Sequence, residues 1–298
     1  MNTPHTLGLE FWVHWLVYGF ILDNVKKFEA FLALCKKNGV AGVELPWKPL
    51  MGLTPLQVAT SLKRYKIKKM ALCIFFGDID PLDGHEGRRA ALVHIENAMR
   101  YIANLRDLGI EVTCIDGPFA YQIGKKYGGG IHHRLHPFLK NVSRIASRYE
   151  TLCCIESLRP EENDAIGDGT TTARVIEWVG SPWIRAHLDT FHMDKHGEEM
   201  IGTLARTGDG LGWFHVSGRD RHTPGSTGDK IDWKIVAAAL TRNRADCDGE
   251  PITCVCFEAF GPAFRKGVPA IGAGFPKDLP PARAIATCKA TLRRAGII

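Results

Sequence analysis

The chain has 298 residues, a formal net charge of +6 at pH 7, 45% hydrophobic residues and 23% charged residues. This composition is typical of a folded globular protein and excludes an intrinsically disordered chain, while the length allows one large domain or two small ones. The basic residues are scattered, with short clusters only at 63–69 and 219–222, so the charge does not indicate a nucleic-acid groove, which needs clustering on one face.

The N-terminal apolar run, Phe11–Leu22, is too short to cross a bilayer and contains His14. It has no Lys or Arg before it and no small-residue cleavage site. Six of the nine cysteines lie in apolar runs resembling buried strands, where cysteine packs as a small hydrophobe. We therefore expect an untargeted, cytoplasmic protein that has neither a membrane nor a nucleic acid as partner.

Short apolar runs alternate with amphipathic stretches along the chain, the pattern of repeated βα units around a parallel sheet. The predicted strands are Leu7–Trp12, Gly42–Leu45, Met70–Phe76, Glu111–Asp116, Leu152–Glu156, Trp183–Asp189, Gly212–Val216 and Ile252–Glu258. The predicted helices are Asp23–Lys37, Thr54–Tyr65, Arg88–Leu108, His136–Ser147, Thr170–Val179, Glu198–Arg206, Trp233–Leu240 and Pro281–Ala295.

Eight strands alternating with eight helices favour a (β/α)8 TIM barrel formed by a single domain, residues 1–298. A doubly wound open sheet would normally carry a glycine-rich dinucleotide loop after an early strand, and no such loop is visible. Two connections, Gly117–His133 and Ala259–Leu279, are longer than usual. Both would follow strands at the C-terminal face of a barrel, so they are candidate pocket walls or lids.

Four side chains that commonly bind metals end or follow the last four predicted strands: Glu156, Asp189, His215 and Glu258. Each of them alone could be structural. Asp189 could cap a helix or form a salt bridge, His215 could be a hydrogen-bonded core residue, and each glutamate could form an ion pair at the rim. In a barrel, however, all four converge at the C-terminal face, where barrel enzymes place their chemistry.

Three crowded carboxylates would repel one another and raise one another's pKa values unless a cation balanced them. A divalent metal ion is such a cation. Three carboxylates and one imidazole form a hard donor set that suits Mn²⁺, Mg²⁺ or Co²⁺ better than metals that prefer thiolates. We therefore expect a divalent metal site that binds Mn²⁺, Mg²⁺ or Co²⁺.

Four segments at these strand ends resemble the ketose 3-epimerases, the tagatose and psicose epimerases of the xylose isomerase-like TIM barrel superfamily. The segments are IESLRPEE, HLDTFHMD, FHVSGRDRHTPG and FEAFG, and LDTFHM is the most specific of them. The resemblance covers residues 156–260. It implies a TIM barrel, an isomerase acting on a small-molecule sugar in carbohydrate metabolism, and a homo-oligomer, either a dimer or a tetramer.

The resemblance also assigns residues to the site. It implies that Glu156, Asp189, His215 and Glu258 bind the metal and that Glu156 and Glu258 are the catalytic acid–base pair. It further implies that the substrate is bound by Glu162, His192, Arg221 and Phe260. These residues would remove a proton next to a carbonyl and return it through a metal-stabilised enediolate, giving ketose 3-epimerisation.

Three positions depart from the family pattern. Residues 158–162 read LRPEE where the family has Asn-Arg-Phe-Glu, and residues 217–220 read SGRD where it has Gly-Glu before the arginine. Glu10 stands where the family carries an aromatic wall residue. These changes leave the expected metal site intact, but they make a larger or more polar substrate possible.

Three other hypotheses stay open at this point. The alternative to an epimerase is a lyase or dehydratase of the same superfamily acting on an inosose or a 3-keto-glycoside, because the same bases eliminate a leaving group β to a carbonyl. A non-catalytic sugar-binding module is another. An apurinic endonuclease is the third, although His132, His133 and His136 do not repeat the histidine pattern at strand ends that those multi-metal enzymes need.

Overall fold

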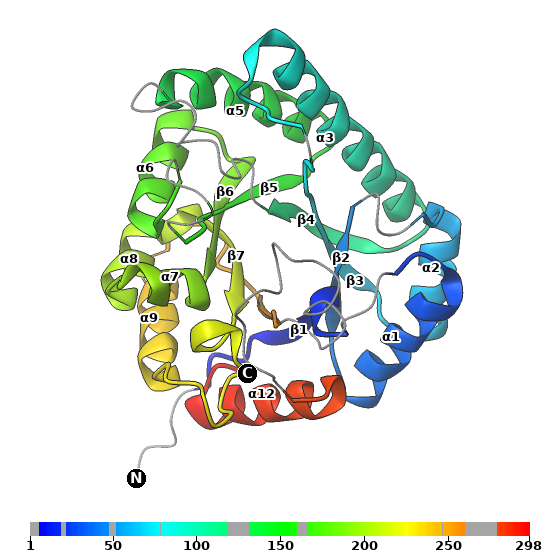
Figure 1. Ribbon diagram of the computed structural model, residues 1–298, viewed down its shortest axis with the longest axis vertical. Helices are drawn as coiled ribbons and strands as arrows, with labels where there is room; N and C mark the ends of the chain where they lie inside the picture. The colour runs from blue at the N-terminus through cyan, green and yellow to red at the C-terminus, as the bar shows by residue number, and fades with distance from the viewer. Residues whose placement is uncertain are drawn as a thin grey trace.

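The computed structural model describes residues 6–18, 22–47, 52–77, 79–117, 131–159, 162, 166–245, 247–259 and 279–298. Its eight strands form a closed barrel in chain order, and every neighbouring pair is parallel. The helices surround this ring of strands (Figure 1). The closed parallel barrel confirms the predicted (β/α)8 TIM-barrel fold.

The strands are β1 (Glu10–His14), β2 (Gly42–Pro46), β3 (Lys69–Cys73), β4 (Glu111–Gly117), β5 (Leu152–Glu156), β6 (Ile184–Asp189), β7 (Leu211–Val216) and β8 (Cys254–Phe257). The α-helices are α1 (Val25–Lys37), α2 (Pro55–Arg64), α3 (Gly84–Asp107), α5 (Ile131–Arg148), α6 (Gly169–Val179), α7 (Thr190–His196), α8 (Met200–Thr207), α9 (Trp233–Ala245) and α12 (Pro281–Ala295). Three-residue 3₁₀ helices are η1 (Trp15–Val17), η3 (Gly208–Gly210) and η4 (Arg219–Arg221).

Local signals in the sequence account for several helix ends. Thr54 and Gln57 form a reciprocal capping box at the start of α2, with Pro55 in the first turn. Asp168 caps α6 by accepting a hydrogen bond from the Thr171 amide at 2.6 Å. Gly180 ends α6 in the left-handed conformation at φ 59°, which glycine adopts without a Cβ penalty.

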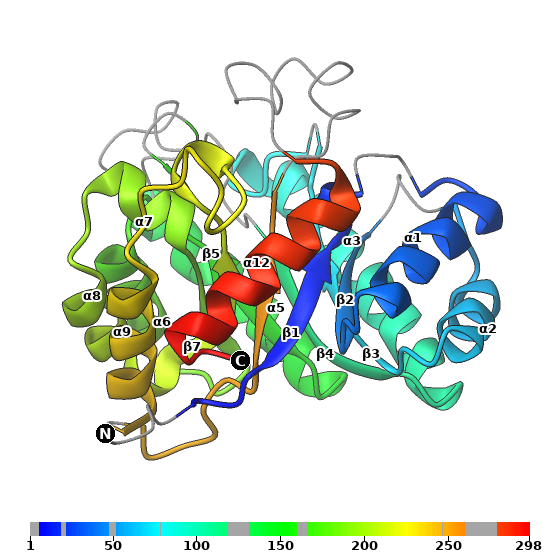
Figure 2. The same cartoon turned by 90° about the horizontal axis from the view of Figure 1, so that it is seen from below.

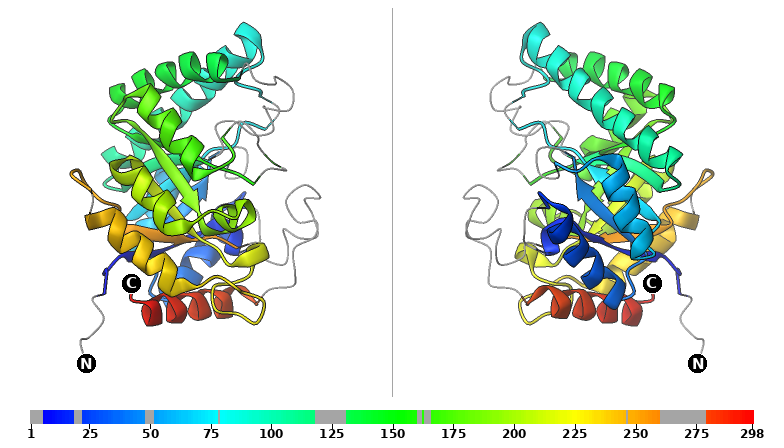
Figure 3. Two further views of the ribbon diagram at one scale, coloured as in Figure 1. Left: turned by 90° about the vertical axis from the view of Figure 1, so that its left-hand side faces the viewer. Right: turned by 90° about the vertical axis from the view of Figure 1, so that its right-hand side faces the viewer.

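The two ends of the chain lie together at the outside of the barrel. The amides of Leu7 and Leu9 donate hydrogen bonds to the carbonyls of Gly296 and Ile297 at 2.8 and 3.1 Å. Figure 3 shows α12 beside the segment that leads into β1. Among the residues that the structure describes, no helix combines the length and apolar character needed to cross a membrane.

A layer of side chains fills the barrel interior below the C-terminal face. It consists of Trp12, Ala71, Cys114, Cys154, Trp213, Cys254 and Cys256, with Leu152 packed against them. The Trp12 and Trp213 rings meet edge to face with centroids 5.3 Å apart. Cysteine therefore serves as a small packing residue here, and this layer forms the apolar floor beneath the polar residues at the strand ends.

Gly42 makes this packing possible, because a Cβ at this position would lie 2.3 Å from the Trp12 ring. We expect Gly42→Ala to lower the free energy of unfolding by about 1–3 kcal/mol, the usual cost of overpacking a core. Urea unfolding followed by circular dichroism measures the change. Gly210→Ala is the control, since its Cβ would find only ordinary contacts at 3.7 Å or more, and equal stability of the two variants would contradict the packing argument.

Glu10 does not lie where the sequence predicted. β1 begins at Glu10 rather than Leu7, so Glu10 occupies the N-terminal end of the barrel, away from the strand ends that carry the candidate site. Its carboxylate accepts hydrogen bonds from Lys69 Nζ at 2.8 Å and Trp12 Nε1 at 3.1 Å. The interpretation of Glu10 as a pocket-wall residue is therefore wrong, because β1 runs two residues further toward the C-terminal face than expected.

Candidate metal and substrate site

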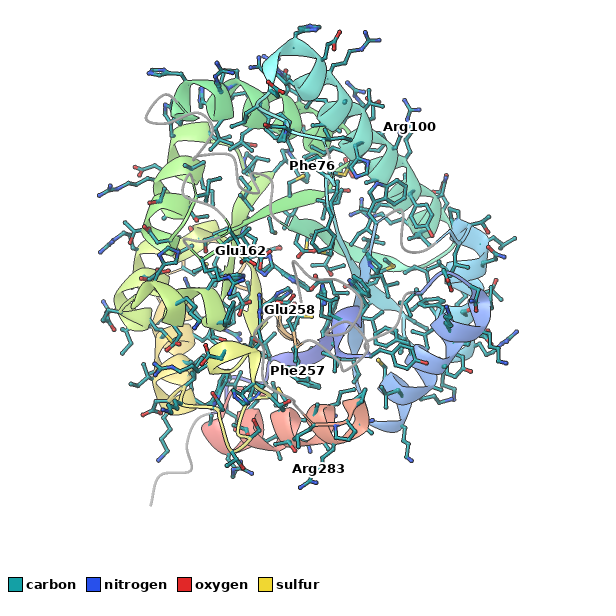
Figure 4. All side chains as sticks on the ribbon, in the orientation of Figure 1. Phe76, Arg100, Glu162, Phe257, Glu258 and Arg283 are labelled. Carbon is teal, nitrogen blue, oxygen red and sulfur yellow. The ribbon has the colours of Figure 1, made fainter. Side chains whose placement is uncertain are left out.

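The structure brings together the four side chains predicted as metal ligands. Glu156 ends β5, Asp189 ends β6, His215 is the penultimate residue of β7, and Glu258 directly follows β8. One potential ligand atom from each lies within 4.8 Å of those of the other three. All four side chains are buried at the carboxyl end of the strands, and Figure 4 shows Glu258 near the middle of the barrel. We call this group the rim cluster.

The rim cluster fits a hard divalent cation. Its donors are three carboxylates and one imidazole, all buried, and a buried uncompensated carboxylate is costly. The Arg221 guanidinium pairs with both Asp189 and Glu258 through Nη1. When all three carboxylates are ionised, one guanidinium balances only one of them, and one divalent cation would balance the other two.

Arg221 is held in its position by a strained turn. Asp220 and Arg221 have φ values of 54° and 60°, in the left-handed region that residues with a Cβ disfavour. Asp229 stabilises the turn by accepting a hydrogen bond from the Arg219 amide at 3.3 Å. Such strain is characteristic of functional sites, and here it places a buried cation beside two carboxylates.

The electrostatic environment separates the two glutamates. Burial raises the pKa of Glu156 well above its usual range, and the charge of Glu258 adds to this. The pKa of Glu258 is lowered well below its usual range, because Arg221 and His215 outweigh the effect of burial. Burial also raises the pKa of Asp189 to about 6, against the opposing effect of Arg221. Two carboxyl groups with pKa values shifted in opposite directions can act as acid and base.

Asp189 combines the two functions that the sequence left as alternatives. Oδ1 accepts a hydrogen bond from the Phe191 amide at 2.9 Å and so caps α7, while Oδ2 pairs with Arg221 in the rim cluster. The helix was not predicted, because it has only seven residues and begins immediately after the strand. Figure 2 shows α7 and the turn after β7 at the same end of the barrel.

His192, on α7, faces the rim cluster as predicted. Its Nε2 lies 3.6 Å from Glu156 Oε1 and 2.9 Å from an Arg221 guanidinium nitrogen, and its Nδ1 accepts a hydrogen bond from the Arg159 amide at 2.9 Å. Burial and the charge of Arg221 lower its pKa well below the usual range, so the ring is neutral. A neutral ring has one lone pair, for which Arg159 and Arg221 compete.

The structure describes Glu162, one of the two remaining residues predicted to bind the substrate, but not Phe260. Glu162 is partly buried at the edge of the site, where its carboxylate lies 3.2 Å from Arg159 Nη2 and 3.9 Å from His192 Nδ1. Phe260 lies outside the described residues, as do most of Gly117–His133 and Ala259–Leu279.

Four further buried polar residues were not predicted as site residues: His14, Glu44, Asp116 and His187. Glu44, on β2, lies 2.7 Å from His215 Nε2 and accepts a hydrogen bond from Trp213 Nε1 at 2.9 Å. The charge of Glu44 outweighs burial and raises the pKa of His215 well above its usual range. A carboxylate behind a histidine ligand fixes the orientation of the ring. The sequence signal that could have identified Glu44 as a site residue is its charge inside the apolar run GVELP.

Comparisons with known proteins point to one family. The chain is 26% identical over 102 residues to the D-psicose 3-epimerase of Enterocloster bolteae, a match covering 34% of this chain and 33% of that protein. The match therefore spans about a third of the length of this curated relative.

The fold is similar to that of two solved epimerases. The D-allulose 3-epimerase of Methylomonas sp. superposes with a TM-score of 0.80 at 17% identity, covering 99% of this chain and 100% of the other. The 3-keto-D-glucoside 4-epimerase of E. coli gives 0.74 at 20% identity, covering 96% and 99%. The profile of the xylose isomerase-like TIM barrel family matches residues 32–263, most of the chain. The chain therefore belongs to the xylose isomerase-like TIM barrel family.

Proposed function

We propose that this protein is a metal-dependent sugar epimerase that removes and returns a proton next to a carbonyl, with ketose 3-epimerisation as its reaction. The observation that carries the proposal is the rim cluster, in which three carboxylates and one imidazole have ligand atoms within 4.8 Å of one another. The names of the relatives, psicose, allulose and keto-glucoside epimerases, support the same chemistry.

Glu156, Asp189, His215 and Glu258 would hold the cation, with Mn²⁺ favoured by the oxygen-rich donor set. A divalent cation bound there supplies the positive charge that makes a proton next to a carbonyl acidic enough to remove. Glu258, ionised because of Arg221 and His215, is the base that takes the proton. Glu156, on the other side of the same carbon, would return a proton to it.

The barrel geometry lets the two carboxyl groups act from different sides. β5 and β8 are not neighbours in the ring of strands, so Glu156 and Glu258 approach a bound sugar from different directions. Removal by one and delivery by the other inverts the carbon between them. His192, Arg221 and Glu162 are the proposed residues that offer hydrogen-bond donors and acceptors to the hydroxyl groups of the sugar, and Phe260 would line the pocket.

The test is proton exchange at carbon 3. Purified protein with Mn²⁺ is incubated in deuterated water with ketoses, an inosose and a 3-keto-glycoside, and the sugars are followed by NMR. We expect deuterium at carbon 3 of a ketose together with its 3-epimer. Absence of exchange with every ketose would contradict the epimerase proposal, whereas loss of water or an aglycone would establish the lyase alternative. The observed position of Glu10 removes one of the three departures from the family pattern that made a larger or more polar substrate possible.

Cation binding should strengthen as the pH rises from 5 to 7.5. Without a cation, the pKa of Asp189 in the folded protein is raised to about 6 from its ordinary value of 3.8. The proton therefore stabilises the folded form fully below pH 3.8, and this stabilisation is lost as the pH rises through 6. A cation competes with that proton for Asp189, so the stabilisation that the cation provides increases as the pH rises. Melting temperatures with Mn²⁺ and with EDTA should differ more at pH 7.5 than at pH 5. An equal difference at both pH values would contradict the assignment of Asp189 as a ligand.

A further inference from the structure

A second group of ionisable side chains lies one layer deeper in the barrel than the rim cluster. Asp116, on β4, pairs in register with Cys154 of β5. Cys154 lies two residues before Glu156, so Asp116 lies deeper in the barrel than the strand end that carries Glu156. His187, on β6, lies two residues before Asp189 and therefore on the same inward face of the strand. Both side chains are completely buried, with 0% exposure. The proposed epimerase reaction uses neither Asp116 nor His187.

These two side chains have unsatisfied hydrogen-bonding atoms. Within the part of the chain that the structure describes, both carboxylate oxygens of Asp116 and both ring nitrogens of His187 have no hydrogen-bond partner. His187 Nδ1 and Asp116 Oδ2 lie 3.3 Å apart, but without hydrogen-bond alignment. Each unsatisfied buried polar group costs about 1–3 kcal/mol, so a ligand that contacts these atoms would remove a substantial cost.

We propose that Asp116, His187 and a ring nitrogen of His215 form a second divalent-cation site inside the barrel, beneath the rim cluster. One ligand atom from each of these three residues lies within 4.8 Å of the others. Ligands ~2.1 Å from a tetrahedral ion lie ~3.4 Å from one another, so small side-chain movements close this triangle around a cation. We call the three residues the inner cluster.

The charge of the barrel interior supports two cations rather than one. The buried carboxylates at this end of the barrel are Glu44, Asp116, Glu156, Asp189 and Glu258. Arg221 provides one positive charge, and a divalent ion in the rim cluster provides two. With His215 as a bridging imidazolate, three negative charges would then remain in this buried space, and a second divalent ion would balance two of them.

The two clusters should prefer different metals. The inner cluster has two imidazoles and one carboxylate, a donor set that suits Zn²⁺ or Co²⁺, whereas the three carboxylates of the rim cluster suit Mn²⁺ or Mg²⁺. His215 connects the clusters: Nδ1 lies 3.2 Å from Glu258 Oε2, and Nε2 lies 2.7 Å from Glu44 Oε2. A neutral imidazole has one lone pair, so an ion on each nitrogen would require the His215 ring to lose its proton and bridge the two ions as an imidazolate.

The test counts metal equivalents in the full chain. The protein is stripped with a chelator, dialysed against Zn²⁺ and then Mn²⁺, and analysed by elemental mass spectrometry. We expect two equivalents per chain in the wild type and one in Asp116→Asn and His187→Leu, with Mn²⁺ retained. Cys154→Ala, which changes a buried interior residue outside both clusters, should keep two. One equivalent in the wild type, or two in both variants, would overturn the proposal.

Two further measurements keep the result unambiguous. If the variants do not fold, anomalous scattering from wild-type crystals soaked in Zn²⁺ decides the question: a peak between Asp116 and His187 supports the inner site, and its absence overturns it. Asp189→Asn should lose the rim ion and keep the inner one. The count is independent of the exchange assay, so failure of the inner site and failure of the epimerase proposal are distinguishable.

Discussion

Replacement of Glu258 by glutamine is expected to lower the rate of proton exchange at carbon 3 by ~10²–10⁴-fold, the usual contribution of a general base. Glu258 is the carboxylate whose pKa Arg221 and His215 hold well below the usual range, so it is ionised and able to accept a proton. Glutamine has nearly the same shape but cannot accept the proton. Glu156→Gln should have an effect of similar size, because it removes the group that holds a proton for delivery.

The measurement must separate proton transfer from metal binding, since both glutamates belong to the rim cluster. Exchange rates at saturating Mn²⁺ are therefore compared with the metal content of the same samples. Glu29→Gln is the matched control, because Glu29 pairs with Arg64 and Ser61 on α2, far from the strand ends. If either site variant kept wild-type exchange with its metal bound, that glutamate could not be an acid–base residue.

The strand pattern predicts the barrel and the rim cluster for the same physical reason. In a closed parallel barrel every strand points the same way, so a polar residue at the end of an apolar run must lie at the C-terminal face. The predicted β5, Leu152–Glu156, has the observed bounds, which places Glu156 at the rim directly. For β1 the apolar run starts at Leu7, before the first strand pairing at Glu10, so Glu10 was assigned to the wrong end of the barrel.

The inner cluster could not be predicted in the same way. Barrel strands are buried on both faces, so their sequences do not show which residues point inward. His187 lies within an apolar run, and only the strand pairing places it beneath Asp189. Glu44, outside the inner cluster, also lies within an apolar run and reaches His215 from β2. The left-handed turn at Asp220 and Arg221 was also invisible, because neither residue type signals positive φ as glycine does.

Asp189→Asn is expected to lower the affinity for Mn²⁺ by more than ~100-fold, because even residues that only support a ligand change affinity by 10–100-fold. The asparagine side-chain oxygen can still cap α7 by accepting the hydrogen bond from the Phe191 amide, whereas the charge facing Arg221 is lost. The loss of affinity, measured by titration calorimetry, should be accompanied by loss of exchange at carbon 3.

Comparison with Asp189→Ala separates the two functions of this residue. Alanine removes the cap as well as the charge, so at equal chelator concentration it should be less stable than Asp189→Asn by about 1 kcal/mol, the usual contribution of a helix cap. Metal affinity should be equally poor in both variants. Equal stability of the two would show that the cap contributes nothing, and wild-type affinity in Asp189→Asn would remove Asp189 from the ligands. Because the four rim residues share one charge balance, that result would also weaken the assignment of Glu156, His215 and Glu258 as ligands.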